Sequence, residues 1–180
     1  LSGQISKVSQ GNHMLTMNDL VGNNAVATWT NPSNPSDIVS FSVKKFNKID
    51  RLTDVNNDIF YNVEFGKVEE INYESVDGKI VQGWVVKPPQ FDSKKKYPLV
   101  LRIHGGPHSM YNVGFNYNFQ LHAAQDQVVL YTNPRGSTGY GYDFANAIQN
   151  AYPGNDYDDI MAGVDEIISR GYIDENKMYV

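Results

Sequence analysis

The 180-residue sequence contains no cysteine, which excludes disulfide bonds, thiol nucleophiles and thiolate metal sites. A chain without disulfides fits a reducing compartment, and we expect a cytoplasmic protein on that ground. No apolar run approaches the roughly 20 residues that a membrane-spanning helix needs. Basic residues are also sparse, because the formal net charge is -5 and the only basic run is Lys94-Lys95-Lys96. Nucleic acids require a concentrated positive face, so they are not expected as partners.

The first third of the chain has the pattern of an antiparallel β-structure. Short runs of β-branched and aromatic residues at 25–30 and 38–43 are separated by turn clusters. Residues 36–43, a polar turn at 44–48 and residues 49–53 predict two paired strands, an arrangement typical of a propeller blade. Blades are stabilised by stacking on neighbouring blades, so we expect residues 1–67 to be one part of a larger propeller.

From residue 68 onward, predicted strands alternate with predicted helices. Residues 68–73 and 80–86 flank Asp77-Gly78 and predict a hairpin. Further strands are expected at 99–104, at 128–132 and from Met178, and helices within 115–127, at 142–151 and at 156–170. The last helix places four apolar residues on one face: Ile160, Val164, Ile167 and Ile168. This alternation predicts a mostly parallel sheet that is covered by helices on both faces.

The predicted strand at 99–104 runs directly into the segment His104-Gly105-Gly106-Pro107. Glycines after a buried strand let the backbone turn sharply, so that a main-chain N–H can reach a substrate carbonyl oxygen. Gly106 is the candidate donor of such an oxyanion hole, and His104 and Gly105 form the rest of the turn. Taken alone, these residues favour a simple tight turn, because glycine and proline are common in turns everywhere.

A second glycine-rich motif, Asn133-Pro-Arg-Gly-Ser-Thr-Gly-Tyr-Gly141, follows the next predicted strand. With the His104 to Pro107 turn, the hairpin end at 82–88 and the helix at 156–170, this motif resembles the prolyl oligopeptidase family of serine peptidases. The similarity is strongest to acylaminoacyl-peptidase and dipeptidyl-peptidase-like members. It covers residues 68–180, and the β-pattern of residues 1–67 fits the propeller that precedes the hydrolase domain in those enzymes.

The resemblance implies the N-terminal half of an α/β-hydrolase domain at 68–180, preceded by the C-terminal part of a β-propeller at 1–67. It also implies hydrolysis of short peptides by acyl-enzyme chemistry, with no cofactor and no metal. Gly106 matches the glycine whose N–H helps to form the oxyanion hole. His104 stands where dipeptidyl-peptidase members have an oxyanion-hole tyrosine, and this departure favours the backbone-donor version of the hole. Arg135 is expected to be an ion-pair anchor rather than a substrate ligand.

The triad of the family follows in the chain order Ser, Asp, His, with the serine on a Gly-x-Ser-x-Gly elbow. No such elbow occurs here, and we expect the triad residues to be absent from the 180 residues. Ser137 is a poor substitute, because its glycine-rich loop predicts neither an elbow nor a base. We therefore expect an inactive portion of a peptidase, whose partners are a short peptide and the remainder of the polypeptide or a complementary chain.

Several alternatives remain open at this stage. An esterase or lipase-like hydrolase would use the same turn, and residues 1–180 would also suit a non-catalytic binding or assembly module; a homo-oligomer is compatible with each reading. His104 and His108 are not expected to bind zinc, because Gly105 to Pro107 prevent the helix that would align them. Three carboxylates are expected to cap the last helix: Asp156, Asp158 and Asp159. Four tyrosines are candidates either for a peptide cleft or for the core: Tyr111, Tyr117, Tyr140 and Tyr142.

Overall fold

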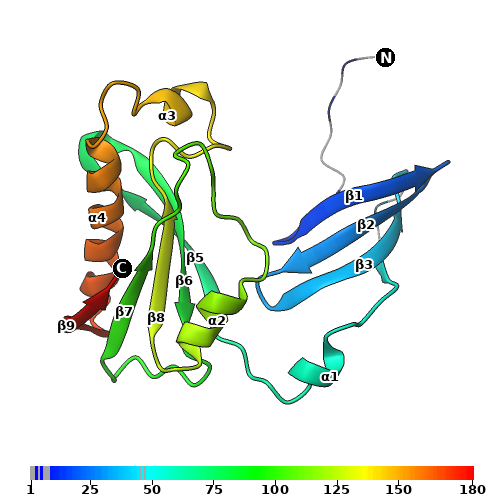
Figure 1. The fold of residues 1–180 in the computed structure, drawn as a ribbon, viewed down its shortest axis with the longest axis horizontal. Coiled ribbons are helices and arrows are strands. Elements are labelled where there is room, and N and C mark those ends of the chain that lie inside the picture. Colours follow the sequence, from blue (N-terminus) through cyan, green and yellow to red (C-terminus); the bar gives the residue numbers. More distant parts are fainter. Residues whose placement is uncertain (1–2, 4, 6–8, 45, 47) are drawn as a thin grey trace. The chain divides into compact units, whose positions relative to one another are not determined.

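The computed structural model describes residues 3, 5, 9–44, 46 and 48–180, which form two units, each with its own sheet (Figure 1). Unit 1 comprises Leu1–Glu64 and Val113–Asn116, and unit 2 comprises Phe65–Asn112 and Tyr117–Val180. Within the described part of the chain, no helix has the length and apolar character needed to cross a membrane.

Unit 1 is built on an antiparallel meander in the order β1-β2-β3-β4. The strands are β1 (Met14–Val21), β2 (Asn24–Asn31), β3 (Asn34–Ser42) and β4 (Asp50–Arg51). Because side chains alternate between the faces of a strand, β2 and β3 together bury Ala25, Ala27, Val39 and Phe41. The core of this sheet is small, with four buried residues.

A buried carboxylate ties the last part of unit 1 to β3. Asp37 accepts hydrogen bonds from the Thr53 hydroxyl at 2.7 Å and from the Val55 N–H at 3.2 Å, and it forms an ion pair with Arg51. Burial opposes ionisation of Asp37, but the hydrogen bonds from Thr53 and Arg51 outweigh it and lower the pKa. The ionised form of Asp37 therefore holds residues 51–55 against the strand.

The strands expected at 25–30 and 38–43 are confirmed to within a few residues. The expected strand at 49–53 is shorter, because the backbone N–H groups of Leu52 and Thr53 both donate to the Ile38 carbonyl instead of continuing the ladder. Residues 57–60 form a short helix, α1 (Asn57–Phe60), where none was predicted. Of the predicted polar turn at 44–48, positions 45 and 47 lie outside the described residues.

Unit 2 contains a five-stranded sheet in the order β5-β6-β8-β7-β9. Its strands are β5 (Lys67–Glu74), β6 (Ile80–Lys87), β7 (Tyr97–Arg102), β8 (Val128–Asn133) and β9 (Ile173–Tyr179). β5 and β6 form the predicted hairpin through the 3-10 turn η1 (Val76–Gly78). β6 also pairs antiparallel with β8, whereas β7 pairs in parallel with both β8 and β9.

Helices cover both faces of this sheet, as predicted. On one face, α4 (Asn155–Ser169) packs Val164 and Ile167 against a core that includes Val128 and Leu130 of β8. On the other face, Phe119 of α2 (Tyr117–Ala123) lies against Tyr131 of β8, with ring centroids 4.7 Å apart. Alternate residues of a strand point to opposite faces, so one strand contacts both helices (Figure 1).

Four expectations for unit 2 need correction. The sheet is mixed rather than mostly parallel, because the hairpin β5-β6 adds antiparallel pairs on one side of it. β7 ends at Arg102 and leaves His104 in the following turn. The helix expected at 142–151 is only α3 (Tyr142–Asn146), and β9 begins at Ile173, five residues before the predicted start.

Candidate active site

The turn after β7 presents two exposed glycines at the edge of a cavity. Gly106 has φ +137°, a backbone conformation that side-chain-bearing residues rarely adopt. A Cβ on Gly106 would lie 3.1 Å from the backbone N of His108 and 3.2 Å from Cβ of Ser109. Both conformation and space therefore require glycine at this position, whereas the same test finds no atom within 4 Å at Gly105.

The glycine-rich loop after β8 runs beside this turn and is bonded to it at several points. His104 Nε2 lies 2.9 Å from Ser137 Oγ, and His108 Nδ1 lies 3.3 Å from the Gly136 carbonyl oxygen. The Thr138 N–H donates to the Ser109 carbonyl at 2.9 Å. These contacts join two segments that are about thirty positions apart in the sequence. The conformation of the turn and that of the glycine-rich loop therefore depend on each other.

Asn133, at the end of β8, binds the backbone of Tyr111, which follows the turn after β7. Its side-chain carbonyl accepts the Tyr111 N–H at 2.7 Å, and its amide donates to the Tyr111 carbonyl at 3.0 Å and to the Tyr140 hydroxyl at 2.7 Å. Asn133 is completely buried, so water cannot bond to its amide and these protein groups satisfy its hydrogen-bonding atoms instead. Burial raises the pKa of Tyr111 and of Tyr140, and both phenols stay neutral at physiological pH.

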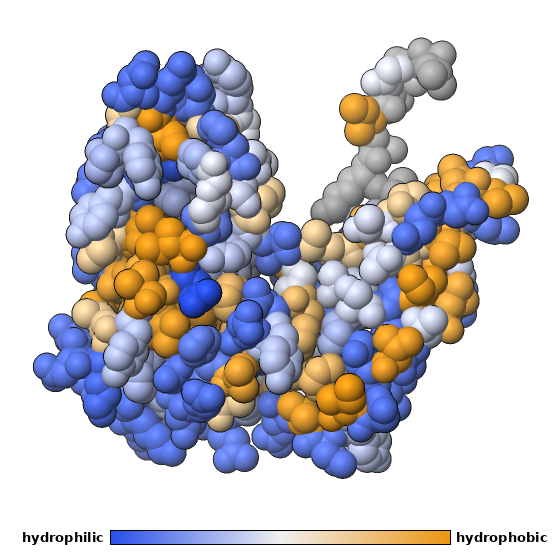
Figure 2. All heavy atoms as spheres, in the orientation of Figure 1, coloured by the Kyte–Doolittle hydropathy of each residue, from blue (hydrophilic) through white to orange (hydrophobic). Residues whose placement is uncertain are grey.

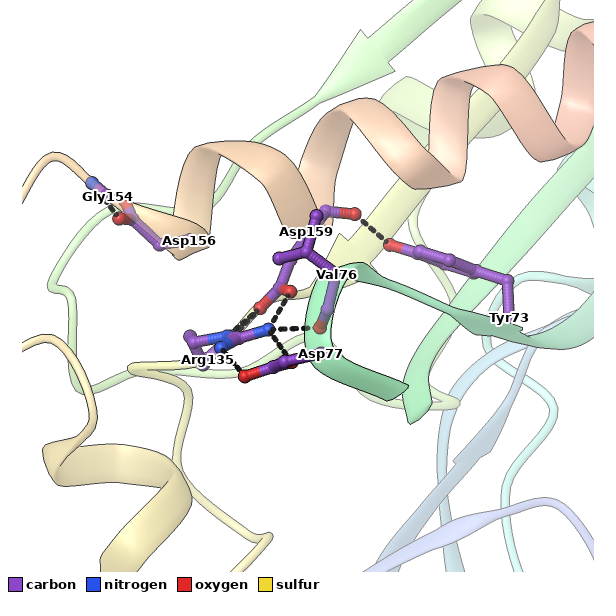
Figure 3. Close-up of polar contacts among 7 residues, drawn as sticks. All are labelled: Tyr73, Val76, Asp77, Arg135, Gly154, Asp156 and Asp159. Carbon is purple, nitrogen blue, oxygen red and sulfur yellow. Dashed lines mark hydrogen bonds and ion pairs between the residues drawn. The ribbon is translucent and has the colours of Figure 1, made fainter. Parts of the chain in front are cut away.

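A buried ion pair anchors the glycine-rich loop to helix α4 (Figure 3). Arg135 donates to the Asp159 carboxylate through its backbone N at 2.8 Å, Nε at 2.9 Å and Nη2 at 2.7 Å. It also donates to both carboxylate oxygens of Asp77 at 3.1 Å. Asp159 is fully buried and Arg135 is 5% exposed. The prediction that Arg135 serves as an ion-pair anchor is confirmed.

The electrostatics follow from this geometry. The hydrogen bonds to Asp159 are the main reason why the pKa of Arg135 is raised, despite its burial. In return, Arg135 lowers the pKa of Asp77. The Tyr73 hydroxyl donates to the Asp159 backbone carbonyl at 2.8 Å, and its own burial raises the pKa of that phenol (Figure 3). The glycine-rich loop is therefore anchored beside the cavity by fixed charges.

The cavity beside the turn has a volume of about 710 Å³ and lies within unit 2. It lies between the turn after β7, the loop after β8 and the segment that joins α3 to α4. Its lining includes His104, Gly105, Gly106, Ser137, Tyr152 and Asp156. The size suits a short peptide segment.

Other candidate residues lie apart from the cavity or act structurally. Among the described residues, no cluster of three or more His, Asp or Glu could hold a metal ion. Tyr117 and Tyr142 are exposed. Asp156 accepts the Gly154 N–H at 2.8 Å, as a carboxylate at a helix start is expected to do (Figure 3). The capping prediction is wrong for Asp159, because burial and the bonds to Arg135 direct its carboxylate into the unit.

Two contacts of the site were not anticipated from the sequence. The turn after β7 places the ring of His104 within hydrogen-bond distance of the Ser137 hydroxyl, at 2.9 Å. The partner of Arg135 was also missed. The signal for it was present: Asp159 lies four positions before Gly163, which with Ile160, Val164 and Ile167 forms the buried face of α4.

Comparison with known proteins agrees with this architecture. The model of the prolyl oligopeptidase family matches residues 113–180. An uncharacterized peptidase of Bacillus subtilis, YuxL, is 42% identical over 156 residues, which are 86% of this chain and 23% of that protein. A probable dipeptidyl-peptidase 5 of Aspergillus terreus is 38% identical over 63% of this chain and 15% of its own length. The acylaminoacyl peptidase of Pyrococcus horikoshii matches in structure, with a TM-score of 0.86 and 26% identity over 99% of this chain and 28% of that one.

These proteins are peptidases by name. Residues 113–180 match the prolyl oligopeptidase family, and the chain as a whole is similar to peptidases. It spans less than a quarter of the length of the two sequence relatives named above.

Proposed function

We propose that this chain supplies one half of the oxyanion hole of a serine peptidase that hydrolyses short peptides through an acyl-enzyme. The observation that carries the proposal is the exposed Gly106 backbone, held at φ +137° on the wall of the cavity. Among the described residues, no acceptor takes the Gly106 N–H in a hydrogen bond. This donor is thus available to a substrate oxygen.

Acyl transfer from a peptide to a serine passes through a tetrahedral intermediate with a negative charge on the former carbonyl oxygen. A fixed N–H that stabilises this charge contributes on the order of 3 kcal/mol to the transition state. Gly106 would supply that N–H, Gly105 would allow the substrate to approach closely, and His104 would support the turn. The bonds to the glycine-rich loop support this assignment, because an oxyanion donor must be positioned before the reaction begins.

The proposed domain assignment is a part of a β-propeller at 1–67 and the N-terminal half of an α/β-hydrolase domain at 68–180. The four-stranded meander of unit 1 supports the first part. The order β5-β6-β8-β7-β9, with helices on both faces, supports the second. The family also supplies the precedent, because its similarity extends over most of the chain.

The surface near the carboxyl end of the chain carries exposed apolar side chains (Figure 2), among them Ile103, Met178 and Val180. β9 lies at the edge of the described sheet, and its outer side has no strand partner there. An apolar surface beside an open strand edge favours association. We propose that the remainder of the same polypeptide, or a complementary chain, covers it.

The catalytic serine, aspartate and histidine are proposed to lie outside these 180 residues. The 180-residue chain is therefore expected not to label with a fluorophosphonate probe, which reacts with activated serines. The intact protein that contains this chain is expected to label. Labelling of the 180-residue chain at Ser137 would contradict the assignment of the nucleophile to another segment.

The Gly106 proposal is tested by Gly106→Ala in the intact protein, with kcat and KM measured on a short chromogenic peptide. The variant is expected to lower kcat far more than KM, since the lost interaction belongs to the transition state. Gly171→Ala is the matched control: Gly171 has φ +83°, and no atom lies within 4 Å of an added Cβ. It carries the backbone strain without touching the cavity. Equal kcat values for Gly106→Ala and the wild type would remove Gly106 from the oxyanion hole.

A further inference from the structure

Both ring nitrogens of His104 have hydrogen-bond partners within unit 2. Nδ1 lies 3.1 Å from the carbonyl oxygen of Gly105, and Nε2 lies 2.9 Å from the Ser137 hydroxyl oxygen. The ring also packs edge-on against Tyr111, with centroids 5.2 Å apart. The imidazole is thus held between the turn and the glycine-rich loop.

These partners determine where the proton of the neutral ring resides. A carbonyl oxygen can only accept a hydrogen bond, so Nδ1 must carry the proton. Nε2 then has a lone pair and accepts the hydroxyl proton of Ser137. Ser137 is 1% exposed, and its backbone N–H is already bonded to the Pro134 carbonyl at 3.0 Å. The hydroxyl is therefore shielded from water, which would otherwise compete for it.

The carbonyl that His104 contacts belongs to the same peptide group as the N–H of Gly106. A peptide group is planar, and in the trans form its C=O and N–H point in opposite directions. A ring that holds the Gly105 carbonyl on one side therefore fixes the direction of the Gly106 N–H on the other. A donor at the carbonyl also polarises the peptide group, which strengthens the N–H as a donor.

We propose that Ser137 is a positioning residue: its hydroxyl holds His104 in the Nδ1–H form, and His104 in turn orients the Gly105–Gly106 peptide group. The proposal rests on the proposed function in that Gly106 is taken as the oxyanion donor. It gives His104 a role that differs from direct contact with the substrate, because both ring nitrogens are already engaged. It also gives a buried serine a purpose that requires no nucleophilic attack.

The tautomer of His104 is measured directly by long-range ¹H–¹⁵N correlation NMR on the intact protein with ¹⁵N-labelled histidine, assigned by comparison with His104→Ala. The wild type is expected to show the Nδ1–H form at His104. In Ser137→Ala, the hydroxyl is lost and the spectrum is expected to shift toward the Nε2–H form. A wild-type ring in the Nε2–H form, or an unchanged tautomer in Ser137→Ala, would overturn the proposal.

Kinetics provide the second measurement. Ser137→Ala is expected to lower kcat about tenfold, the effect of one lost hydrogen bond, with KM changed by less than about twofold. Ser75→Ala is the matched control, because Ser75 is buried in the same unit and its hydroxyl has no partner among the described residues. That variant is expected to retain the wild-type kcat.

Because Ser137 is proposed to act through His104, the two substitutions are expected to be strongly non-additive. Ser137→Ala should have no further effect on kcat in a His104→Ala background. Additive losses would show that Ser137 acts by another route. A normal kcat in Gly106→Ala would refute the proposed function, and the NMR result would still decide the tautomer of His104. A low kcat in Gly106→Ala together with a normal kcat in Ser137→Ala would refute only the positioning role of Ser137.

Discussion

The ion pair between Arg135 and Asp159 makes a quantitative prediction about the stability of unit 2. Asp159→Asn removes the charge of a fully buried carboxylate and leaves the Arg135 guanidinium, 5% exposed, without its main partner. Breaking a buried pair in this way typically costs about 3 to 5 kcal/mol. Asp77 remains as a second partner, but it is half exposed and screened by water. We therefore expect a loss near the lower limit, about 3 kcal/mol.

The assay is urea unfolding followed by tryptophan fluorescence. The chain has two tryptophans, of which Trp84 is buried in unit 2 and Trp29 belongs to unit 1. A Trp29→Phe background lets the signal report on unit 2 alone. Asp165→Asn provides the control on the same helix, because Asp165 is exposed and such substitutions usually change stability by less than about 0.5 kcal/mol. A loss of less than about 1 kcal/mol in Asp159→Asn would refute the assignment of this pair as the anchor of the loop.

Two further predictions concern packing and pH. Gly163→Ala would place a Cβ 2.7 Å from the Tyr73 hydroxyl, so we expect overpacking of about 1 to 3 kcal/mol, partly relieved by Tyr73→Phe in the same unfolding assay. The lowered pKa of Asp37 makes its stabilisation complete above the ordinary value of 3.8 and lost as the pH falls through the lower folded value. Acid unfolding of unit 1, monitored at Trp29 in a Trp84→Phe background, should lose that component in Asp37→Asn; an unchanged acid transition would disprove it.

The elements that the sequence predicts well are those with a strong local pattern. The β5-β6 hairpin has runs rich in β-branched and aromatic residues on both sides of Asp77-Gly78, and α4 has apolar residues at helical spacing. The mixed character of the sheet was harder to predict, because the pairing of β6 with β8 joins residues about fifty positions apart. Local patterns determine which segments become strands, but pairing is determined by the packing of the whole unit.

The candidate site shows the same division. The sharp backbone turn at Gly106 could be predicted from the sequence, since glycines directly after a buried strand allow such a turn. The partners of His104 and Arg135 could not, because Ser137 lies 33 positions from His104 and Asp159 lies 24 positions from Arg135. An aspartate in the first turns of a helix has a sufficient local explanation as a cap. The helical spacing places Asp159 on the buried face of α4, but which residue it would meet there depends on the tertiary structure.

The glycine-rich loop illustrates why composition is a poor guide to rigidity at an active site. Gly136, Gly139 and Gly141 all have positive φ, which gives the loop a path that other residues would strain to follow. Its polar atoms, however, are bonded to the buried Asp159 on one side and to the half-buried His104 on the other. The glycines allow this backbone conformation, and the hydrogen bonds of the Arg135 and Ser137 side chains stabilise it. Displacing Arg135 should therefore disturb Gly106 through Ser137 and His104, although Arg135 contacts neither residue of the proposed oxyanion peptide group.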